Sequence, residues 1–137
     1  MGYFAGGTIT TGIQNTLIGG LAGDALTDAD YNVAMGVSAL SADTLGSRSV
    51  AIGSSALGAQ NFTSATNSYN VAVGYSAGAA VTTGTNNTFI GGLAGDAITT
   101  GISNTAIGYN ALTQETTGDQ SVAIGQSALR LSLIHIS

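Results

Sequence analysis

The stretch Asn104-Thr105-Ala106-Ile107-Gly108-Tyr109-Asn110-Ala111-Leu112 contains the pattern that decides the fold, because variants of it recur along the chain. A glycine returns every 17 residues, with a single spacing of 21, and an alanine follows it three residues later every time. A fixed period of this kind is typical of repeat architectures, in which each repeat packs mainly on its neighbours. The two columns are Gly2, Gly19, Gly36, Gly53, Gly74, Gly91, Gly108 and Gly125, and Ala5, Ala22, Ala39, Ala56, Ala77, Ala94, Ala111 and Ala128.

Each repeat predicts one short strand directly before its glycine. There the chain has Asn or Ser, a β-branched residue, a usually small residue and an aliphatic residue, as in Ser49-Val50-Ala51-Ile52-Gly53. This alternation has the two-residue period of a strand, and the remainder of the repeat is turn sequence such as Thr82-Thr83-Gly84. A repeat of 17 residues is too short for a strand, a helix and two connections. We therefore predict an all-β, parallel β-solenoid or β-roll of about eight coils over residues 1–130.

The fourth and the seventh residue after each repeat glycine vary together, and we call these positions place four and place seven. Where place four is Gly, place seven is aliphatic, and where place four is Leu, place seven is polar. Because protein interiors are close-packed, we predict that both places flank one pocket that is filled once per coil. The first kind comprises Gly6 with Ile9, Gly23 with Leu26, Gly78 with Val81 and Gly95 with Ile98, and the second Leu40 with Asp43, Leu57 with Gln60 and Leu112 with Glu115.

The single longer spacing marks an insertion of four residues within residues 59–68. A solenoid accommodates extra residues on a turn, so this loop is expected to project, and projecting loops often carry recognition. Asn61 and Phe62 in the insertion, and Tyr75 and Tyr109 directly after repeat glycines, are the candidate surface contacts. The alternatives are a neutral insertion and tyrosines that pack on the next coil.

The composition excludes several classes of partner. Only 7% of the 137 residues are charged, Arg48 and Arg130 are the only basic residues besides one His, and the net charge is −5. Such a chain cannot neutralise a run of phosphates, so nucleic acid is not expected as a partner. No apolar run approaches the roughly 18 residues of a membrane span, and none is predicted.

The residue inventory also argues against catalysis. The chain has no Cys and no Lys, and its only His is His135, so neither a Ser-His-Asp triad nor a His-based metal site can be assembled. The acidic group Asp24, Asp28 and Asp30 lacks the spacing of a calcium loop and is better explained as a solvated turn. We predict a protein that is not an enzyme and has no metal and no cofactor.

Both ends depart from the repeat. Met1 falls in the aliphatic position before Gly2, as if the chain began within a strand, and the pattern stops after Leu129. Residues 131–137 look like the translation of an adapter sequence used to prepare DNA libraries. The expectation is a fragment truncated at both ends with a foreign tail over residues 131–137.

Runs such as residues 104–112, spaced by Thr-Thr-Gly turns, resemble repeats of phage-type tail-fibre proteins, and Ser121-Val122-Ala123-Ile124-Gly125 is similar to the head repeats of YadA-like trimeric autotransporter adhesins. The resemblance implies a left-handed parallel β-roll in a homotrimer. The period of 17 residues is longer than that of the adhesin heads, which favours the tail fibre. A narrow coil also encloses few apolar groups against a backbone ordering cost of about 1–2 kcal/mol per residue, so lateral association would help to stabilise it.

The expected function is that of a shaft and receptor-contact segment in a virion tail fibre that attaches to a host cell surface, with glycans among the candidate receptors. The first alternative is the head of a trimeric adhesin on the bacterial outer surface. The second is an ice-binding solenoid, since threonines form a rank at equivalent turn positions. That rank comprises Thr10, Thr27, Thr44, Thr82, Thr99 and Thr116.

Overall fold

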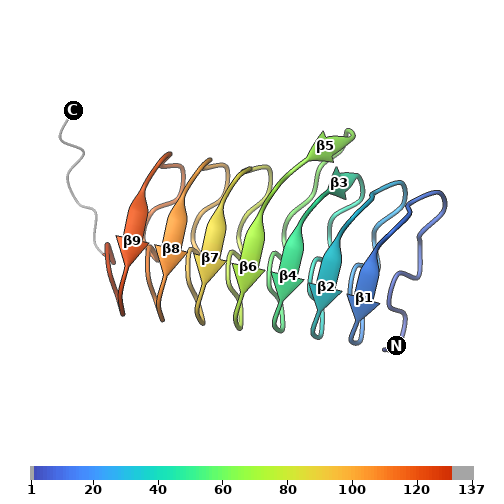
Figure 1. The fold of residues 1–137 in the computed structure, drawn as a ribbon, viewed down its shortest axis with the longest axis horizontal. Helices are drawn as coiled ribbons and strands as arrows, with labels where there is room; N and C mark the ends of the chain where they lie inside the picture. The colour runs from blue at the N-terminus through green and yellow to red at the C-terminus, as the bar shows by residue number, and fades with distance from the viewer. Residues whose placement is uncertain (1, 131–137) are drawn as a thin grey trace.

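The strands predicted before the repeat glycines are present from Gly19 to Gly125 in the computed structural model, which describes residues 2–130. Every coil contributes one strand to a parallel sheet, and the described residues contain no helix, hence none that could cross a membrane (Figure 1). The all-β parallel solenoid is thereby confirmed. The strands are β1 (Thr16–Ile18), β2 (Val33–Met35), β3 (Gly46–Ser47), β4 (Val50–Ile52), β5 (Thr66–Asn67), β6 (Val71–Val73), β7 (Thr88–Ile90), β8 (Thr105–Ile107) and β9 (Val122–Ile124).

The main sheet has seven strands in the order β1-β2-β4-β6-β7-β8-β9, all parallel. Its register pairs equivalent positions of successive repeats, as in Val33 with Val50, and the pairing of Val50 with Val71 absorbs the longer spacing. About six full turns thus lie between β1 and β9, fewer than the predicted eight coils. Residues 2–15 and 125–130 add incomplete turns at the two ends, without a strand before the first glycine in the described residues.

The repeat glycines are required by close contact between coils. From Gly19 to Gly125 they have φ angles between 121° and 141°, a region that side chains strongly disfavour. A Cβ atom added to Gly91 would lie 2.7 Å from the carbonyl carbon and oxygen of Gly108 in the next coil. The backbone of one coil therefore rests directly on that of the next, which explains the glycine column.

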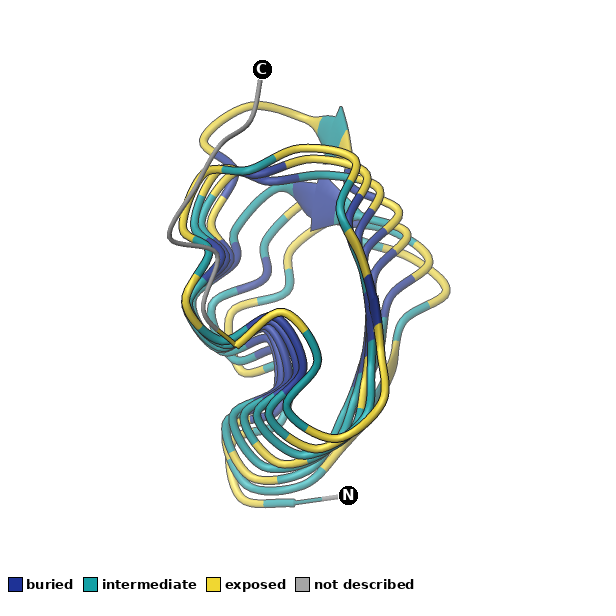
Figure 2. Ribbon diagram, turned by 90° about the vertical axis from the view of Figure 1, so that its left-hand side faces the viewer, coloured by how far each residue is buried: buried dark blue, intermediate teal, exposed yellow. Residues whose placement is uncertain are grey.

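The interior of the coil is narrow and is filled mainly by alanine. The central residue of each strand faces inward, and Ala34, Ala51, Ala72 and Ala106 are completely buried there. The alanines three places after the repeat glycines are also buried, from Ala22 to Ala111. Figure 2, which views the rod end-on, shows the coils as nearly superimposed outlines whose inner-facing segments are buried.

A buried asparagine before the strands links neighbouring coils. The Nδ2 of Asn87 donates to the carbonyl oxygen of Gly101 at 2.9 Å, and its Oδ1 accepts from the backbone N–H of Asn104 at 2.9 Å. The N–H of Asn87 in turn donates to Oδ1 of Asn70. Each amide thus satisfies backbone groups that the short strands leave unpaired, which buried polar groups require.

The pocket shared by places four and seven is present, and a third position contributes to it. A Cβ on Gly23 would lie 2.8 Å from Cδ1 of Leu26, so the aliphatic side chain at place seven does cover the glycine at place four. At Gly78 and Gly95, however, the nearest atoms belong to the Phe89 ring, at 2.7 and 2.4 Å from the added Cβ. The strand centre carries a large residue here, as Leu17 does in β1, although the repeat usually has a small residue at that place.

We expect Leu112→Gly to lower the free energy of unfolding by about 2–4 kcal/mol, because a large buried side chain is removed. Leu112 has a φ of 57°, so glycine relieves rather than creates backbone strain and the loss reports packing. Adding Glu115→Ile should restore part of the loss. The restoration is incomplete because Glu115 Oε1 accepts from the N–H of Gly118 at 2.9 Å.

Thermal unfolding followed by circular dichroism measures this pair, with Glu115→Ile alone as the control. If the single and double variants melt at the same temperature, places four and seven do not share a pocket.

Candidate interaction surfaces

The acidic side chains do not form a metal centre in the described part of the chain. No group of three or more His, Asp or Glu residues lies within ligand distance there. Asp28 accepts from the Thr11 hydroxyl at 2.6 Å, and Asp30 accepts from the N–H of Ile13 at 2.7 Å, so both hold neighbouring coils together. Burial raises the pKa of Asp96, an effect that hydrogen bonds from the Asp96 and Ala97 backbone partly offset.

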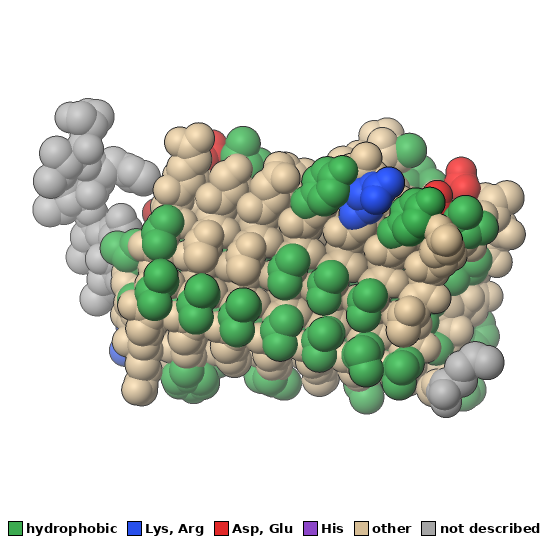
Figure 3. Space-filling view, in the orientation of Figure 1, with side chains coloured by type: hydrophobic (Ala, Val, Ile, Leu, Met, Phe, Trp, Pro, Cys, Tyr) green, Lys and Arg blue, Asp and Glu red, His purple; other side chains and the backbone are tan. Residues whose placement is uncertain are grey.

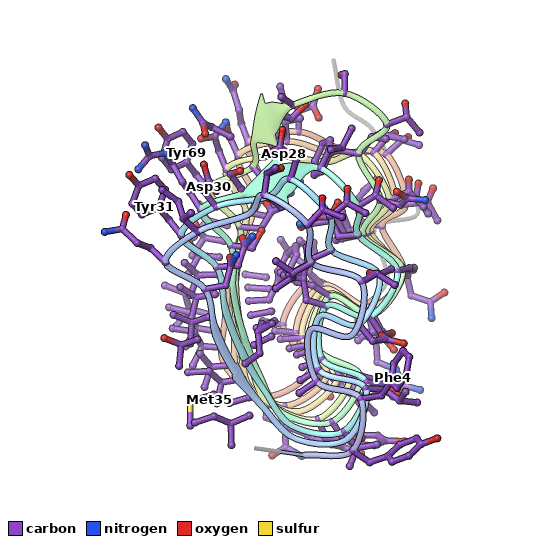
Figure 4. The ribbon with its side chains drawn as sticks, turned by 90° about the vertical axis from the view of Figure 1, so that its right-hand side faces the viewer. Phe4, Asp28, Asp30, Tyr31, Met35 and Tyr69 are labelled. Atoms are coloured by element: carbon purple, nitrogen blue, oxygen red, sulfur yellow. The ribbon has the colours of Figure 1, made fainter. Side chains whose placement is uncertain are left out.

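The outer face of the main sheet is predominantly apolar and carries no charged side chain. The first and third residues of each strand point outward, and all fourteen are Val, Ile, Met or Thr. Ile18, Ile90 and Ile124 are 47, 40 and 67% exposed. Rows of hydrophobic side chains follow the rod axis in Figure 3, and Met35 projects from this side in Figure 4. We call these fourteen residues the sheet face.

The insertion has a buried base and an exposed tip. Residues 63–65 are exposed, and β5 pairs with β3 in a small two-stranded sheet that rises above the rest of the rod (Figure 1). At the base, Gln60 Nε2 donates to Asp43 Oδ2 at 2.6 Å and to Ser49 Oγ at 2.8 Å. Asn70 Nδ2 donates to Gln60 Oε1 at 2.8 Å. Ser49 interrupts the asparagine series, and the longer Gln60 amide takes over its bonding.

The four predicted surface contacts do not form one site. Tyr75 and Tyr109 are 65 and 54% exposed, and Asn61 is also exposed. Phe62 is only 6% exposed, so its prediction as a surface contact is wrong. Its ring packs against Gly46, where only an absent side chain leaves room for it, and its N–H donates to Asp43.

The threonine rank is engaged within the solenoid. The hydroxyls of Thr10, Thr27, Thr82 and Thr99 each donate to a backbone carbonyl of the next coil, at 2.9 to 3.2 Å. A hydroxyl has one O–H donor, so a threonine that donates to a carbonyl has no donor left for ordering water. The rank is therefore accounted for by contacts between coils.

A cluster without a signature in the repeat pattern lies on the rim above the sheet face. Tyr31, Arg48 and Tyr69 occupy the same coil position in consecutive coils, two residues before β2, β4 and β6. The Arg48 guanidinium lies 4.6 Å from the centre of the Tyr31 ring. Figure 4 shows Tyr31 and Tyr69 projecting to the same side. Spacings of 17 and 21 residues separate the three in sequence, so only the alignment of the coils reveals the cluster.

Comparisons of the chain with protein families, curated proteins and solved structures found no match.

Proposed function

We propose that this chain is a non-enzymatic shaft and receptor-contact segment of a phage tail fibre, assembled as a homotrimer and attached to a host cell surface. The observation that carries the proposal is the sheet face, which is predominantly apolar and has no charged side chain over its seven strands. Exposed apolar surface of this extent on a soluble protein usually marks an interface. A stiff rod with one adhesive side suits a fibre whose copies lie side by side.

The sheet face is best matched by another copy of the same chain. Its side chains repeat with the spacing of parallel strands, about 4.8 Å, over seven successive strands. Only a partner with the same axial repeat can meet every row at once, and an identical chain has that repeat. Lateral packing would also remove aliphatic side chains such as Ile107 and Ile124 from water, at roughly 25 cal/mol per Å² of apolar surface.

We expect the whole chain to sediment as a trimer, and Ile90→Lys to weaken this association at least about tenfold, because it buries an unpaired charge in the interface. Ile102→Lys is the matched control: Ile102 is 42% exposed against 40% for Ile90, but it lies on the rim outside the sheet face. Sedimentation equilibrium of the three proteins measures the effect. A wild-type chain that stays monomeric, or equal weakening by both substitutions, would remove the support for lateral assembly.

The head of a trimeric autotransporter adhesin on the bacterial outer surface is the alternative, since the same coil geometry would suit it. The 17-residue period favours the tail fibre in this comparison. The genes that flank this one in the source DNA distinguish the two: virion structural genes support the fibre, and an isolated adhesin operon supports the surface protein.

A further inference from the structure

Tyr31, Arg48 and Tyr69, which we call the rim cluster, differ in residue type from the residues at the same position of the other coils, and the fold does not require this difference. The backbone at this position has a positive φ in every described coil, with values of 58°, 65° and 50° at Tyr31, Arg48 and Tyr69. Bulky side chains are disfavoured in this region, whereas small polar residues such as Asn tolerate it. The other coils have Gln14, Asn86, Ser103 and Gln120 there. The other coils thus have only uncharged polar side chains at this position, and the cluster alone brings two aromatic rings and a cation together there. Exposed residues of this kind on a regular scaffold are often retained for binding.

The Arg48 side chain is oriented but not neutralised. Its guanidinium lies over the Tyr31 ring, and its Nε donates to Asn67 Oδ1 of β5 at 3.2 Å. Within residues 2–130 no carboxylate forms an ion pair with it, although the chain carries a net charge of −5. The terminal amino groups of the guanidinium have no hydrogen-bond acceptor among the described residues. They are available to a ligand, and a planar guanidinium with two parallel donors matches a carboxylate.

The surroundings of Arg48 suit a sugar. Tyr31 and Tyr69 are 44 and 53% exposed, and exposed aromatic rings offer an apolar surface with a polar edge. The tip of the insertion adds polar side chains beside Arg48, including the exposed Asn67 of β5. Because no second cation lies nearby and Asp28 and Asp30 are on the adjoining coil, an extended polyanion would be repelled.

We propose that Tyr31, Arg48 and Tyr69 form a binding site for a carboxylate-bearing sugar on the host cell surface, with Arg48 pairing the carboxylate and the two tyrosines contacting the sugar ring. This inference rests on the proposed function, since it names the receptor chemistry of that fibre. Sialic acids and uronic acids share the recognised group. A single exposed site binds weakly, and side-by-side copies would raise the overall affinity through multivalency.

Titration of the whole chain with sialyl-lactose, galacturonic acid and neutral lactose, followed by NMR, tests the site. We expect a dissociation constant of roughly 1 mM for at least one acidic sugar, and no binding of lactose. Binding of sialyl-lactose alone, of galacturonic acid alone or of both identifies the source of the carboxylate. Arg48→Gln should weaken binding about tenfold because a charge-assisted pair is lost, and it should remove the dependence of affinity on salt.

Matched substitutions separate the site from general charge and aromatic effects. Tyr69→Ser should weaken binding about threefold to tenfold without unfolding the coil, because Ser occupies this coil position at Ser103. Arg130→Gln and Tyr75→Ala change the other arginine and another exposed tyrosine, and neither should alter the affinity. Unchanged affinity in Arg48→Gln, equal binding of lactose, or no binding at about 10 mM sugar would overturn the proposal.

The failure of this site and the failure of the fibre proposal are distinguishable. A chain that assembles through the sheet face but does not bind acidic sugars retains the fibre and loses the site. A chain that binds the sugar through Arg48 but remains monomeric retains the site and loses lateral assembly.

Discussion

Gly91→Ala should lower the free energy of unfolding by about 3 kcal/mol or more, because two separate penalties act on the same atom. The φ of Gly91 is 128°, which an L side chain rarely adopts. The new Cβ would also lie 2.7 Å from the carbonyl carbon and oxygen of Gly108, and a backbone group cannot move aside as a flexible side chain can. The change therefore forces two coils apart in the middle of the rod.

Gly92→Ala is the control for this substitution, one residue along the chain. The nearest atom to its added Cβ is Cδ2 of Tyr109 at 3.4 Å, which is ordinary contact, and its φ is not positive. We expect its melting temperature to equal or slightly exceed that of the wild type, since alanine restricts the unfolded chain more than glycine does. Urea unfolding followed by circular dichroism compares the two. A similar midpoint for Gly91→Ala and the wild type would show that the coils are not in direct backbone contact at the glycine column.

Asn87→Asp should cost about 3 kcal/mol at neutral pH, although the two side chains have nearly the same shape. Asn87 is completely buried, and the substitution replaces the Nδ2 that donates to Gly101 by a second acceptor oxygen. The carbonyl of Gly101 is then left without its donor and faces a buried negative charge. Asn86→Asp is the matched control, because Asn86 is exposed and its side chain donates only to the Thr85 hydroxyl among the described residues.

The cost of Asn87→Asp should depend on pH in a defined direction. Burial favours the neutral carboxyl, so the pKa of the introduced aspartate is raised in the folded state above its unfolded value. The destabilisation is therefore complete above the folded pKa and disappears as the pH falls below the unfolded pKa, where both states are protonated. Melting temperatures of both variants measured from neutral to acidic pH test this. A pH-independent loss, or an equal loss in Asn86→Asp, would contradict a buried amide series that bonds the coils.

Sequence alone was sufficient for the fold class because the constraint that makes the solenoid is repeated in every coil. A glycine such as Gly91 must allow the next backbone to approach, and an alanine such as Ala94 must fit a narrow interior. Each requirement admits one residue type, so it is visible as a column at a fixed period. The strands follow from the same alternation, and their parallel register follows from the period.

Features that occur once could not be predicted in this way. Phe62 looked like an exposed residue on a projecting loop, but Gly46 in the preceding coil leaves space for its ring. Phe89 occupies a strand centre that is alanine in five of the other six strands of the main sheet, because Gly78 and Gly95 leave room on either side of it. In each case a glycine in one coil makes room for a ring from another coil. The sequence does not show which residues pair in this way, because the stacking of the coils, and not proximity along the chain, brings them together.

The sequence by itself determined the coil, its period and the position of its one insertion, because these depend on steric limits that act on each repeat separately. Only the tertiary structure decided which strand residues face outward as the sheet face and that Tyr31, Arg48 and Tyr69 are adjacent. The physical reason is that an alternating strand pattern allows either face to be buried. That choice depends on how the other side of the coil folds against the sheet, and the stacking of coils then brings equivalent residues into contact.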